Sequence, residues 1–183
     1  MRTDEDLAYG IQQGRRNDLA ELVERHHSPL IGYLYRLSGG DRLLAEDLAQ
    51  EVFLRVLRSI SQYRHPHPFK PWLYQIATNL ARDHFKRAES RYVVAMPDDA
   101  SSFPADSQPE DAFLLTAAGQ SVAQAIRSLP LHQREVVILR YYQELSLAEI
   151  AGVLAIPLGT VKSRLSLGIQ RLRAMLLEQE FES

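Results

Sequence analysis

The sequence predicts an all-α protein of two small helical domains joined by a flexible acidic linker. Apolar residues recur at the three- and four-residue steps of helices, and no convincing alternating strand pattern is found. The composition also changes after residue 91, where a stretch rich in Pro, Ser and Asp begins. Helical patterns resume beyond it. We therefore predict a first domain at 1–91, a linker at 92–112 and a second domain at 113–183.

The first domain is expected to be a four-helix bundle. A short leading helix is predicted at 4–13, and longer helices at 17–39, 41–60 and 68–90. Pro71 is compatible with the first turn of the fourth helix, because the first N–H groups of a helix have no partner within it. The third helix carries a regular apolar stripe that should face the bundle. Its members are Leu44, Leu48, Val52, Val56 and Ile60.

The predicted linker differs from both domains in charge. No Lys or Arg occurs from Tyr92 to Ile126. Such a segment buries little apolar surface and is expected to act as a tether. The composition alone leaves open whether the tether is inert. Five acidic residues fall in it: Asp98, Asp99, Asp106, Glu110 and Asp111.

The second domain is predicted to hold helices at 113–129 and 130–142, followed by a helix-turn-helix. Ser146 and Glu149 have the spacing of a capping box, and "AIPLG" follows as a short turn. Thr160 is predicted to be the N-cap of the last helix. That helix should bury Val161, Leu165, Ile169, Leu172 and Leu176.

The opposite side of the last helix is polar and cationic. Ser163, Ser166 and Gln170 form its crest, and four cations flank that crest. Such a helix suits a DNA major groove, where the crest reads base edges and the flanks meet phosphates. The alternative is a surface helix with ordinary solvated charges. The flanking cations are Lys162, Arg173, Arg164 and Arg171.

Several classes of function are excluded or disfavoured by what the sequence lacks. It has no cysteine, so it has no disulfide scaffold, Cys-ligated zinc or thiol nucleophile. No signal peptide or long apolar run is found, so we expect a cytoplasmic protein without direct membrane contact. No acid/base pair, nucleophile motif or phosphate-binding Gly loop predicts an enzyme or a cofactor. His65 and His67 lack accompanying carboxylates, so no metal site is predicted.

The run "SLPLHQREVVILRYYQELSLAEIAGVLAIPLGTVKSRL" resembles the −35 binding domain of the extracytoplasmic-function (ECF) class of bacterial sigma factors. Two departures from that family stand out. Ala155 replaces a common Gly at a turn that tends to need a positive φ, and "SLGI" at 166–169 replaces Ser-Arg-Ala-Arg. Leu167 is therefore hypothesised to touch thymine methyl groups. The −35 contacts that the resemblance implies are Thr160, Lys162, Ser163, Arg164, Ser166, Leu167 and Arg171.

The N-terminal half resembles two further regions of the same family. The acid, amide and leucine stripe on 41–60 resembles the surface that grips the clamp helices of the β′ subunit of RNA polymerase. Its predicted core-binding residues are Asp47, Gln50, Glu51, Phe53 and Leu54. The segment "FKPWLYQIATNLARDHFKR" resembles the −10 region, although the plainer interpretation of Trp72 is that of a core residue. The predicted −10 contacts are Tyr63, Arg64, Trp72, Asn79, Arg82 and Lys86.

Melting a promoter without ATP requires capture of the opened strand, by aromatic or amide groups for bases and by cations for the backbone. The resemblance thus implies a promoter-specificity subunit with no cofactor. Its expected partners are core RNA polymerase, through the β′ clamp helices and the β flap, promoter DNA, and an anti-sigma factor. The competing hypothesis is a stand-alone helix-turn-helix regulator whose N-terminal bundle dimerises or senses a ligand.

Overall fold

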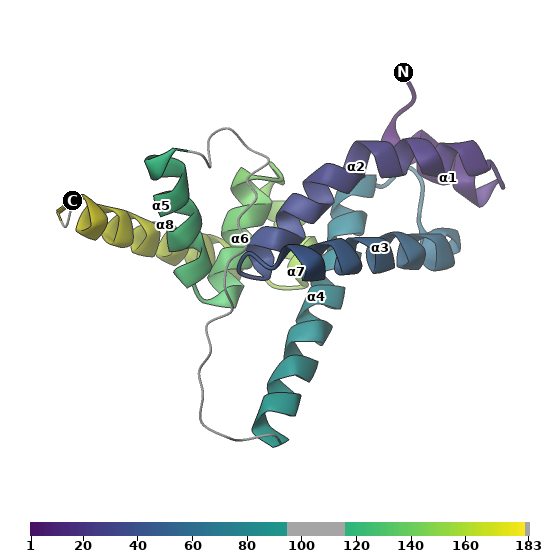
Figure 1. Cartoon of the computed structure of the whole chain (residues 1–183). Coiled ribbons are helices and arrows are strands. Elements are labelled where there is room, and N and C mark those ends of the chain that lie inside the picture. The colour runs from purple at the N-terminus through teal and green to yellow at the C-terminus, as the bar shows by residue number, and fades with distance from the viewer. Residues whose placement is uncertain (95–115, 182–183) are drawn as a thin grey trace.

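The structure is a computed structural model that describes residues 1–94 and 116–181, and every regular element in these residues is helical (Figure 1). This confirms the predicted all-α class. The elements are α1 (Asp4–Gln12), α2 (Arg16–Leu37), α3 (Arg42–Ser59), the 3₁₀ turn η1 (Ile60–Gln62), α4 (Phe69–Val94), α5 (Ala117–Ser128), α6 (Leu131–Tyr141), α7 (Leu147–Leu154) and α8 (Leu158–Phe181).

The helices begin where side chains satisfy their first N–H groups. Thr3 and Asp6 form a reciprocal capping box at α1, and the Asp41 carboxylate accepts from the Leu44 N–H at α3. The α4 helix is capped from a distance, since the Glu5 carboxylate accepts from the Phe69 N–H at 3.0 Å. This bond fixes α1 against the start of α4.

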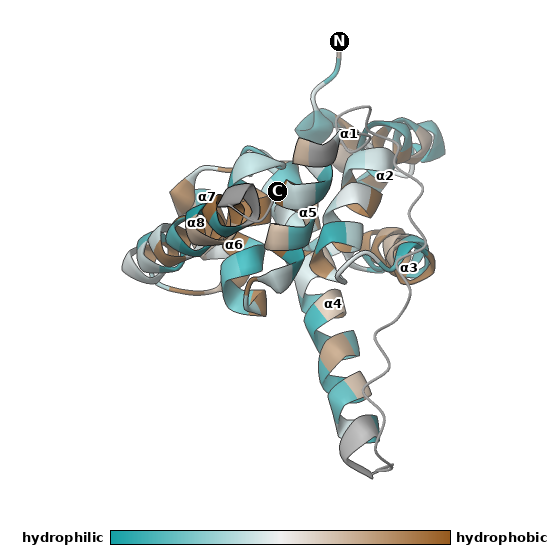
Figure 2. Ribbon diagram, turned by 60° about the vertical axis from the view of Figure 1, so that its left-hand side comes forward, coloured by the Kyte–Doolittle hydropathy of each residue, from teal (hydrophilic) through white to brown (hydrophobic). Residues whose placement is uncertain are grey.

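The apolar stripe predicted on α3 faces the bundle as expected. Leu48, Val52 and Val56 are buried, and Leu44 and Ile60 are partly buried against the same core. Burial of each such side chain contributes about 1.5–3 kcal/mol relative to leaving it exposed. Polar and apolar residues share each helix instead of segregating between helices, as the hydropathy colouring shows (Figure 2). The helices are therefore amphipathic and depend on packing for their stability.

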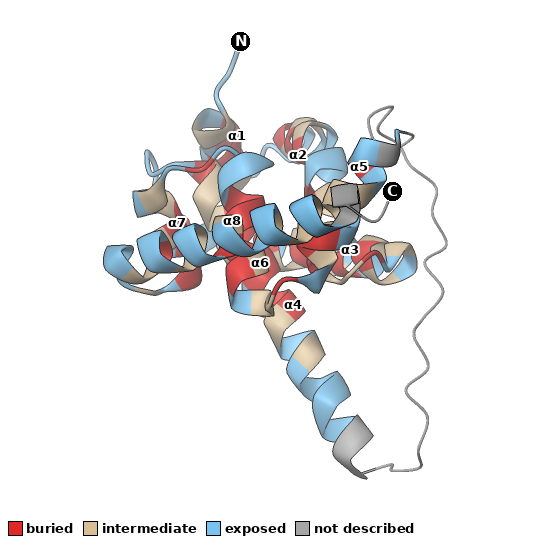
Figure 3. Ribbon diagram, turned by 90° about the vertical axis from the view of Figure 1, so that its left-hand side faces the viewer, coloured by how far each residue is buried: buried red, intermediate tan, exposed pale blue. Residues whose placement is uncertain are grey.

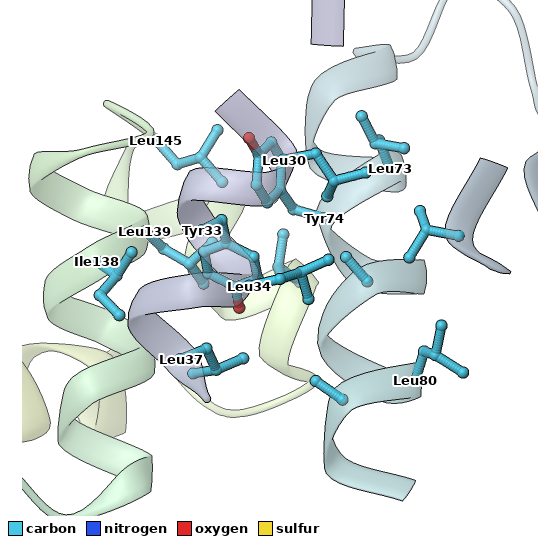
Figure 4. Packing of buried hydrophobic residues seen from close by; sticks show 14 of the residues in the cluster. Leu30, Tyr33, Leu34, Leu37, Leu73, Tyr74, Leu80, Ile138, Leu139 and Leu145 are labelled. Carbon is cyan, nitrogen blue, oxygen red and sulfur yellow. The ribbon is translucent and has the colours of Figure 1, made fainter. Parts of the chain in front are cut away.

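The helices of the two predicted domains pack against one another instead of standing apart. Helix α4 lies against α7, and α2 lies against α6 and α5. One continuous apolar cluster results, with Tyr33 and Leu34 of α2 between Tyr74 of α4 and Leu139 of α6 (Figure 4). Periodicity within each half gave no sign of this shared core, because the contacts join residues far apart in sequence.

Helix α4 is longer than predicted and its far end projects from the packed body (Figures 1 and 3). It ends at Val94, so it includes residues 92–94, which the sequence assigned to the linker. The rest of the predicted linker, 95–112, lies outside the described residues. So do residues 113–115 of the helix predicted at 113–129.

Within the described part of the chain, no single helix combines the length and apolarity that crossing a membrane requires. The bent pair of α7 with α8 as far as Glu178 meets those criteria only when its two helices are taken together.

Candidate nucleic-acid interface

Helices α7 and α8 form the predicted helix-turn-helix. They meet at 104° across a three-residue turn, which is the angle range typical of this motif. The capping box at α7 is present in both directions. The Ser146 N–H donates to Glu149 Oε2 at 2.8 Å, and the Glu149 N–H donates to Ser146 Oγ at 3.2 Å. Local sequence signals thus fix the start of α7.

Ala155 ends α7 in the left-handed conformation, with φ of 52°. This confirms that the turn needs a positive φ at the position where the family commonly has Gly. The Ala155 N–H donates to the Gly152 carbonyl and the Ile156 N–H to the Ala151 carbonyl, so the last turn of α7 is closed. The alanine Cβ makes this conformation costly, by about 1 kcal/mol relative to glycine.

Thr160 does not cap α8, so that prediction is wrong. The helix begins at Leu158, and the Pro157 carbonyl accepts from the N–H groups of Thr160 and Val161 at 3.0 and 3.1 Å. Thr160 therefore lies inside the first turn, with its own carbonyl accepting from Ser163 Oγ. The proline, whose φ is fixed, sets the start of the helix three residues earlier than the cap chemistry suggested.

The predicted crest of α8 lies on the surface. Ser163 and Ser166 are exposed, and Leu167 is 48% exposed. Of the predicted cations, Lys162 and Arg171 are exposed and Arg164 is half-buried. Arg171 also donates to Gln133 Oε1 of α6 at 3.2 Å. The −35 residues predicted from the sequence thus share one helix, with its crest open to solvent and its cations beside that crest.

The departure "SLGI" at 166–169 is largely a packing feature. A Cβ on Gly168 would lie 3.0 Å from Val137 Cγ2 and 3.6 Å from Gln133 Cβ, both on α6. Ile169 is half-buried. Gly168 therefore lets α6 and α8 approach closely, and only Leu167 alters the exposed crest. The sequence contained this glycine, but no local pattern indicated which helix it faces.

The predicted polymerase-binding residues lie on α3, and all except Phe53, which packs against the core, belong to its outer side. Asp47, Gln50 and Leu54 are exposed, whereas Glu51 and Phe53 are half-buried. Glu51 pairs with Arg55 at 3.2 Å, and Phe53 stacks on His27. Leu43 and Leu57 are also exposed and continue the same stripe at three- and four-residue steps. We call the five exposed residues the α3 outer face: Leu43, Asp47, Gln50, Leu54 and Leu57.

Two of those leucines, Leu43 and Leu57, were not among the polymerase-binding residues predicted from the sequence. Leu43 is 77% exposed and Leu57 is 39% exposed. Their spacing from Asp47 and Leu54 would have identified them, because a helix face recurs every three or four residues. An apolar stripe on the outside of a bundle, flanked by an acid and an amide, is typical of a surface that docks a partner helix.

Tyr63 does not reach the surface, so it does not wall an open base pocket in this structure. The Tyr63 side chain is 4% exposed, and its hydroxyl donates to the His67 carbonyl. Its ring centroid lies 5.3 Å from that of Trp72 and 5.9 Å from that of Phe69. Burial raises the pKa of Tyr63 to about 12. Trp72 is partly buried in the same aromatic cluster, which favours its interpretation as a core residue. Arg64 is exposed beside them.

Helix α1 supports this loop, a role that the sequence did not indicate. Gln12 Nε2 donates to the carbonyls of Ile60 and Tyr63, both at 2.7 Å. Tyr9 packs on His65, with ring centroids 5.2 Å apart. These contacts hold the residues on either side of Arg64, so they set the position of Arg64.

The predicted −10 residues on α4 have different surroundings. Asn79 and Lys86 are exposed. Arg82 instead forms a two-point ion pair with Glu135 of α6, with Nε–Oε1 and Nη2–Oε2 distances of 2.6 Å. The Arg82 side chain is 27% exposed and that of Glu135 only 1%. The bonds to Glu135 raise the pKa of the Arg82 guanidinium above its ordinary value.

No metal site accompanies these surfaces. Across residues 1–94 and 116–181, no group of three or more His, Cys, Asp or Glu side chains is arranged to hold a metal ion. His65 lies 3.8 Å from Asp6 and against Tyr9, and these contacts explain its position.

Two family models match separate parts of the chain. Residues 22–91 match the family model of sigma-70 region 2, and residues 119–172 match that of sigma-70 region 4. The chain is 39% identical over 164 residues to the ECF RNA polymerase sigma factor SigE of Mycolicibacterium smegmatis. It is 34% identical over 174 residues to SigW of Bacillus subtilis. These alignments cover 89% and 91% of this chain, and 63% and 92% of the two relatives.

Two solved structures share the fold. The structure of CnrH in complex with the cytosolic domain of CnrY aligns with a TM-score of 0.70 at 24% identity, covering 94% of this chain and 96% of that one. RpoE in complex with the anti-sigma factor NepR from Bartonella quintana aligns with a TM-score of 0.68 at 23% identity, covering 87% and 96%. The chain belongs to the ECF RNA polymerase sigma factors of the sigma-70 family.

Proposed function

We propose that this protein binds core RNA polymerase, directs it to promoters through −35 and −10 elements, and aids melting of the −10 element. The observation that carries the proposal is the presence in one chain of an exposed helix-turn-helix crest and a separate outer face on α3. The protein has no chemistry of its own in this proposal. It works in the cytoplasm, where the polymerase is.

The −35 element is bound by α8. Ser163 and Ser166 face base edges, while Lys162, Arg164 and Arg171 reach base edges or phosphates from the flanks. Leu167 projects from the crest and contacts thymine methyl groups. Thr160 lies in the first turn, where its backbone is close to the phosphates. The exposure of Ser163, Ser166 and Leu167 supports these roles, and Arg171 would have to leave Gln133 Oε1 of α6 to reach DNA.

The −10 element is bound by α4 and the loop before it. Asn79 holds an unstacked base, and Arg64, Arg82 and Lys86 bind the backbone of the opened strand. Tyr63 and Trp72 support this surface from beneath. The β′ clamp helices dock on the α3 outer face, with Glu51 and Phe53 at its edge. The β flap is proposed to contact the C-terminal domain.

We place the domain boundaries at 1–91, 92–112 and 113–183, and the matched regions 22–91 and 119–172 support this division. We also propose an anti-sigma partner. CnrH and RpoE share the fold and are found with CnrY and with the anti-sigma factor NepR, respectively. No direct membrane contact is proposed for this chain.

Co-purification with core polymerase, followed by run-off transcription on a promoter library, tests the proposal. We expect a stable complex that initiates from a restricted set of promoters. Strong binding to palindromic DNA without polymerase, with no effect on start sites, would instead favour the stand-alone regulator. A chain that neither joins the polymerase nor changes its choice of promoter would refute the proposal.

A further inference from the structure

The two aromatic residues predicted to contact the −10 strand both pack against the core. Tyr63 is buried, and Trp72 is half-buried between Tyr63 and Phe69, with ring centroids 5.3 and 5.8 Å away. Proteins that capture a single strand stack its bases on aromatic side chains and bind its backbone with cations. The cations are present on and beside α4, but an open stacking ring has to come from another element.

Helix α1 provides an exposed ring beside this surface. Tyr9 is 44% exposed, and among the side chains described in residues 1–91 it is the one exposed Phe, Trp or Tyr. Its ring centroid lies 5.2 Å from that of His65, with 42° between the two ring planes. His65 is itself exposed and directly follows the exposed Arg64. We call Tyr9 and His65 the ring pair.

The rest of α1 holds the Tyr9 ring in place. Leu7 and Ala8 are fully buried in the core, and Gln12 Nε2 donates to the Tyr63 carbonyl at 2.7 Å. Figure 1 shows α1 beside the segment that leads from α3 into α4. A tyrosine on an anchored helix loses little conformational entropy when a base stacks on it, because its side chain has only two torsions.

Asp6 fixes the other member of the ring pair. Asp6 Oδ1 lies 3.8 Å from His65 Nε2, and Asp6 Oδ2 accepts from the Thr3 N–H at 3.3 Å. This carboxylate disfavours a phosphate at the ring pair, because two negative charges repel at short range. A neutral base is not repelled in this way. The ring pair therefore suits the base of a nucleotide, while the neighbouring Arg64 suits its phosphate.

We propose, on the basis of the proposed function of the α4 surface, that the ring pair stacks one base of the opened −10 strand while Arg64 binds the adjacent phosphate. At a rise of 1.5 Å per residue, Asn79 and Lys86 lie roughly 15 and 25 Å along α4 from Phe69. The ring pair lies beside the start of α4, so its base is a different one from the base held by Asn79. Stacking accepts any base, so this contact adds affinity more than sequence preference.

A holoenzyme reconstituted from core polymerase and the full-length chain tests this proposal. The probe is a labelled single strand that carries the non-template −10 sequence of a promoter found by run-off transcription. In further probes, the base at one position at a time is replaced by an abasic sugar. Fluorescence anisotropy measures the affinity of each holoenzyme for each probe, with core polymerase alone as the baseline.

Three variants separate the ring from the fold. Tyr9→Leu removes the ring but keeps an apolar side chain on α1, whereas Tyr9→Phe keeps the ring. Tyr141→Leu is the matched control, because Tyr141 is 58% exposed at the end of α6, in the region not proposed to bind the single strand. We expect Tyr9→Leu to weaken binding of the intact probe about tenfold, Tyr9→Phe to stay within about twofold of the parent, and Tyr141→Leu to match it. On the probe that lacks the stacked base, Tyr9→Leu and the parent should bind equally.

A Tyr9→Leu holoenzyme that binds every probe as the parent does would overturn the proposal. An equal loss on all probes, each abasic one included, would also overturn it, because the ring would then support the loop instead of meeting a base. Weaker pull-down of core polymerase by Tyr9→Leu, with strand affinity unchanged at saturating chain, would assign the ring to the polymerase instead.

His65→Ala decides the test if circular dichroism shows that Tyr9→Leu has lost helicity, since this change leaves α1 intact. We then expect a loss that disappears on one abasic probe, and either no loss or a uniform loss would overturn the proposal. A parent holoenzyme with no preference for the −10 probe over a scrambled strand would refute the proposed function, and the ring pair with it. A selective parent with unaffected variants would remove only the ring pair.

Discussion

The two surfaces proposed to contact DNA differ in how accessible the fold leaves them. On α8, Ser163, Ser166 and Leu167 lie at the surface, and the helix is held only from its opposite side. On α4, Arg82 is paired with a buried carboxylate, and Tyr63 of the preceding loop is buried. One surface is thus ready in the free chain, while the other needs a rearrangement. Accessibility separates the two even though both carry amides, hydroxyls and cations.

Replacing Asp47 and Gln50 together by alanine should have the largest effect. Without bound polymerase, neither the α8 surface nor the α4 surface can direct transcription. Both side chains lie on the α3 outer face, so we expect polymerase binding to weaken by on the order of 2–4 kcal/mol. Transcription from every promoter should fall together. Binding of the free chain to −35 duplex should stay at the parental level, and a parallel loss there would contradict the assignment. Pull-down with core polymerase and gel shift provide the two measurements.

Arg164→Ala should weaken −35 duplex binding by about 1–3 kcal/mol with a change in base preference if the guanidinium touches a base, and uniformly if it touches phosphate. This variant affects only the surface on α8, so the affinity of the chain for a single DNA strand should not change. A binding selection on randomised −35 duplex distinguishes the two forms of contact. Undiminished duplex binding would exclude Arg164 from the interface.

Gln12→Ala should affect only the surface around α4. Two hydrogen bonds to the carbonyls of Ile60 and Tyr63 are lost, and each is worth about 0.5–1.5 kcal/mol. Arg64 is then less well positioned, so we expect the holoenzyme to form fewer open complexes. Permanganate footprinting measures open-complex formation. Gln13→Ala, an exposed neighbour, is the control. Normal melting by Gln12→Ala would show that the α1 contacts do not position the loop.

Leu167→Arg should change preference at one −35 position by about 1 kcal/mol, since a thymine methyl contact is exchanged for a hydrogen-bonding cation. Gly168 faces α6 and Ile169 is half-buried, so the effect should be confined to the crest. Selection on randomised duplex checks this. An unchanged preference would mean that Leu167 does not meet a base.

Ala155→Gly should have the smallest effect and should increase stability. The residue has φ of 52°, and glycine removes the Cβ strain there at some cost in unfolded-state entropy. We expect a gain of about 0.5 kcal/mol in the free energy of unfolding, with −35 preference unchanged. Urea denaturation measures it. A loss of stability would show that the turn tolerates alanine without strain.

The sequence predicted the helices and their apolar faces, because these depend on residues within a few positions of one another. The α3 stripe, the capping box at Ser146 and the positive φ at Ala155 were predicted and are confirmed. Thr160 was misassigned because Pro157 begins α8 earlier than side-chain capping signals indicate.

The features that sequence reasoning missed join distant segments. Glu5 with Phe69 and Arg82 with Glu135 are 64 and 53 positions apart. Helical periodicity contains no information about which helices meet, so the shared core and the pairing of Arg82 could not be predicted from it. The burial of Tyr63 could not be predicted for the same reason, because Phe69 and Trp72 enclose its ring only after the loop folds back on α4.

The most direct test compares one chain on two probes, a −35 duplex and a single strand carrying the non-template −10 sequence, each measured with and without core polymerase. We expect the free chain already to bind the duplex selectively, and polymerase to raise its single-strand affinity at least about tenfold more than its duplex affinity. Equal gains on the two probes, or strong single-strand binding by the free chain, would contradict it.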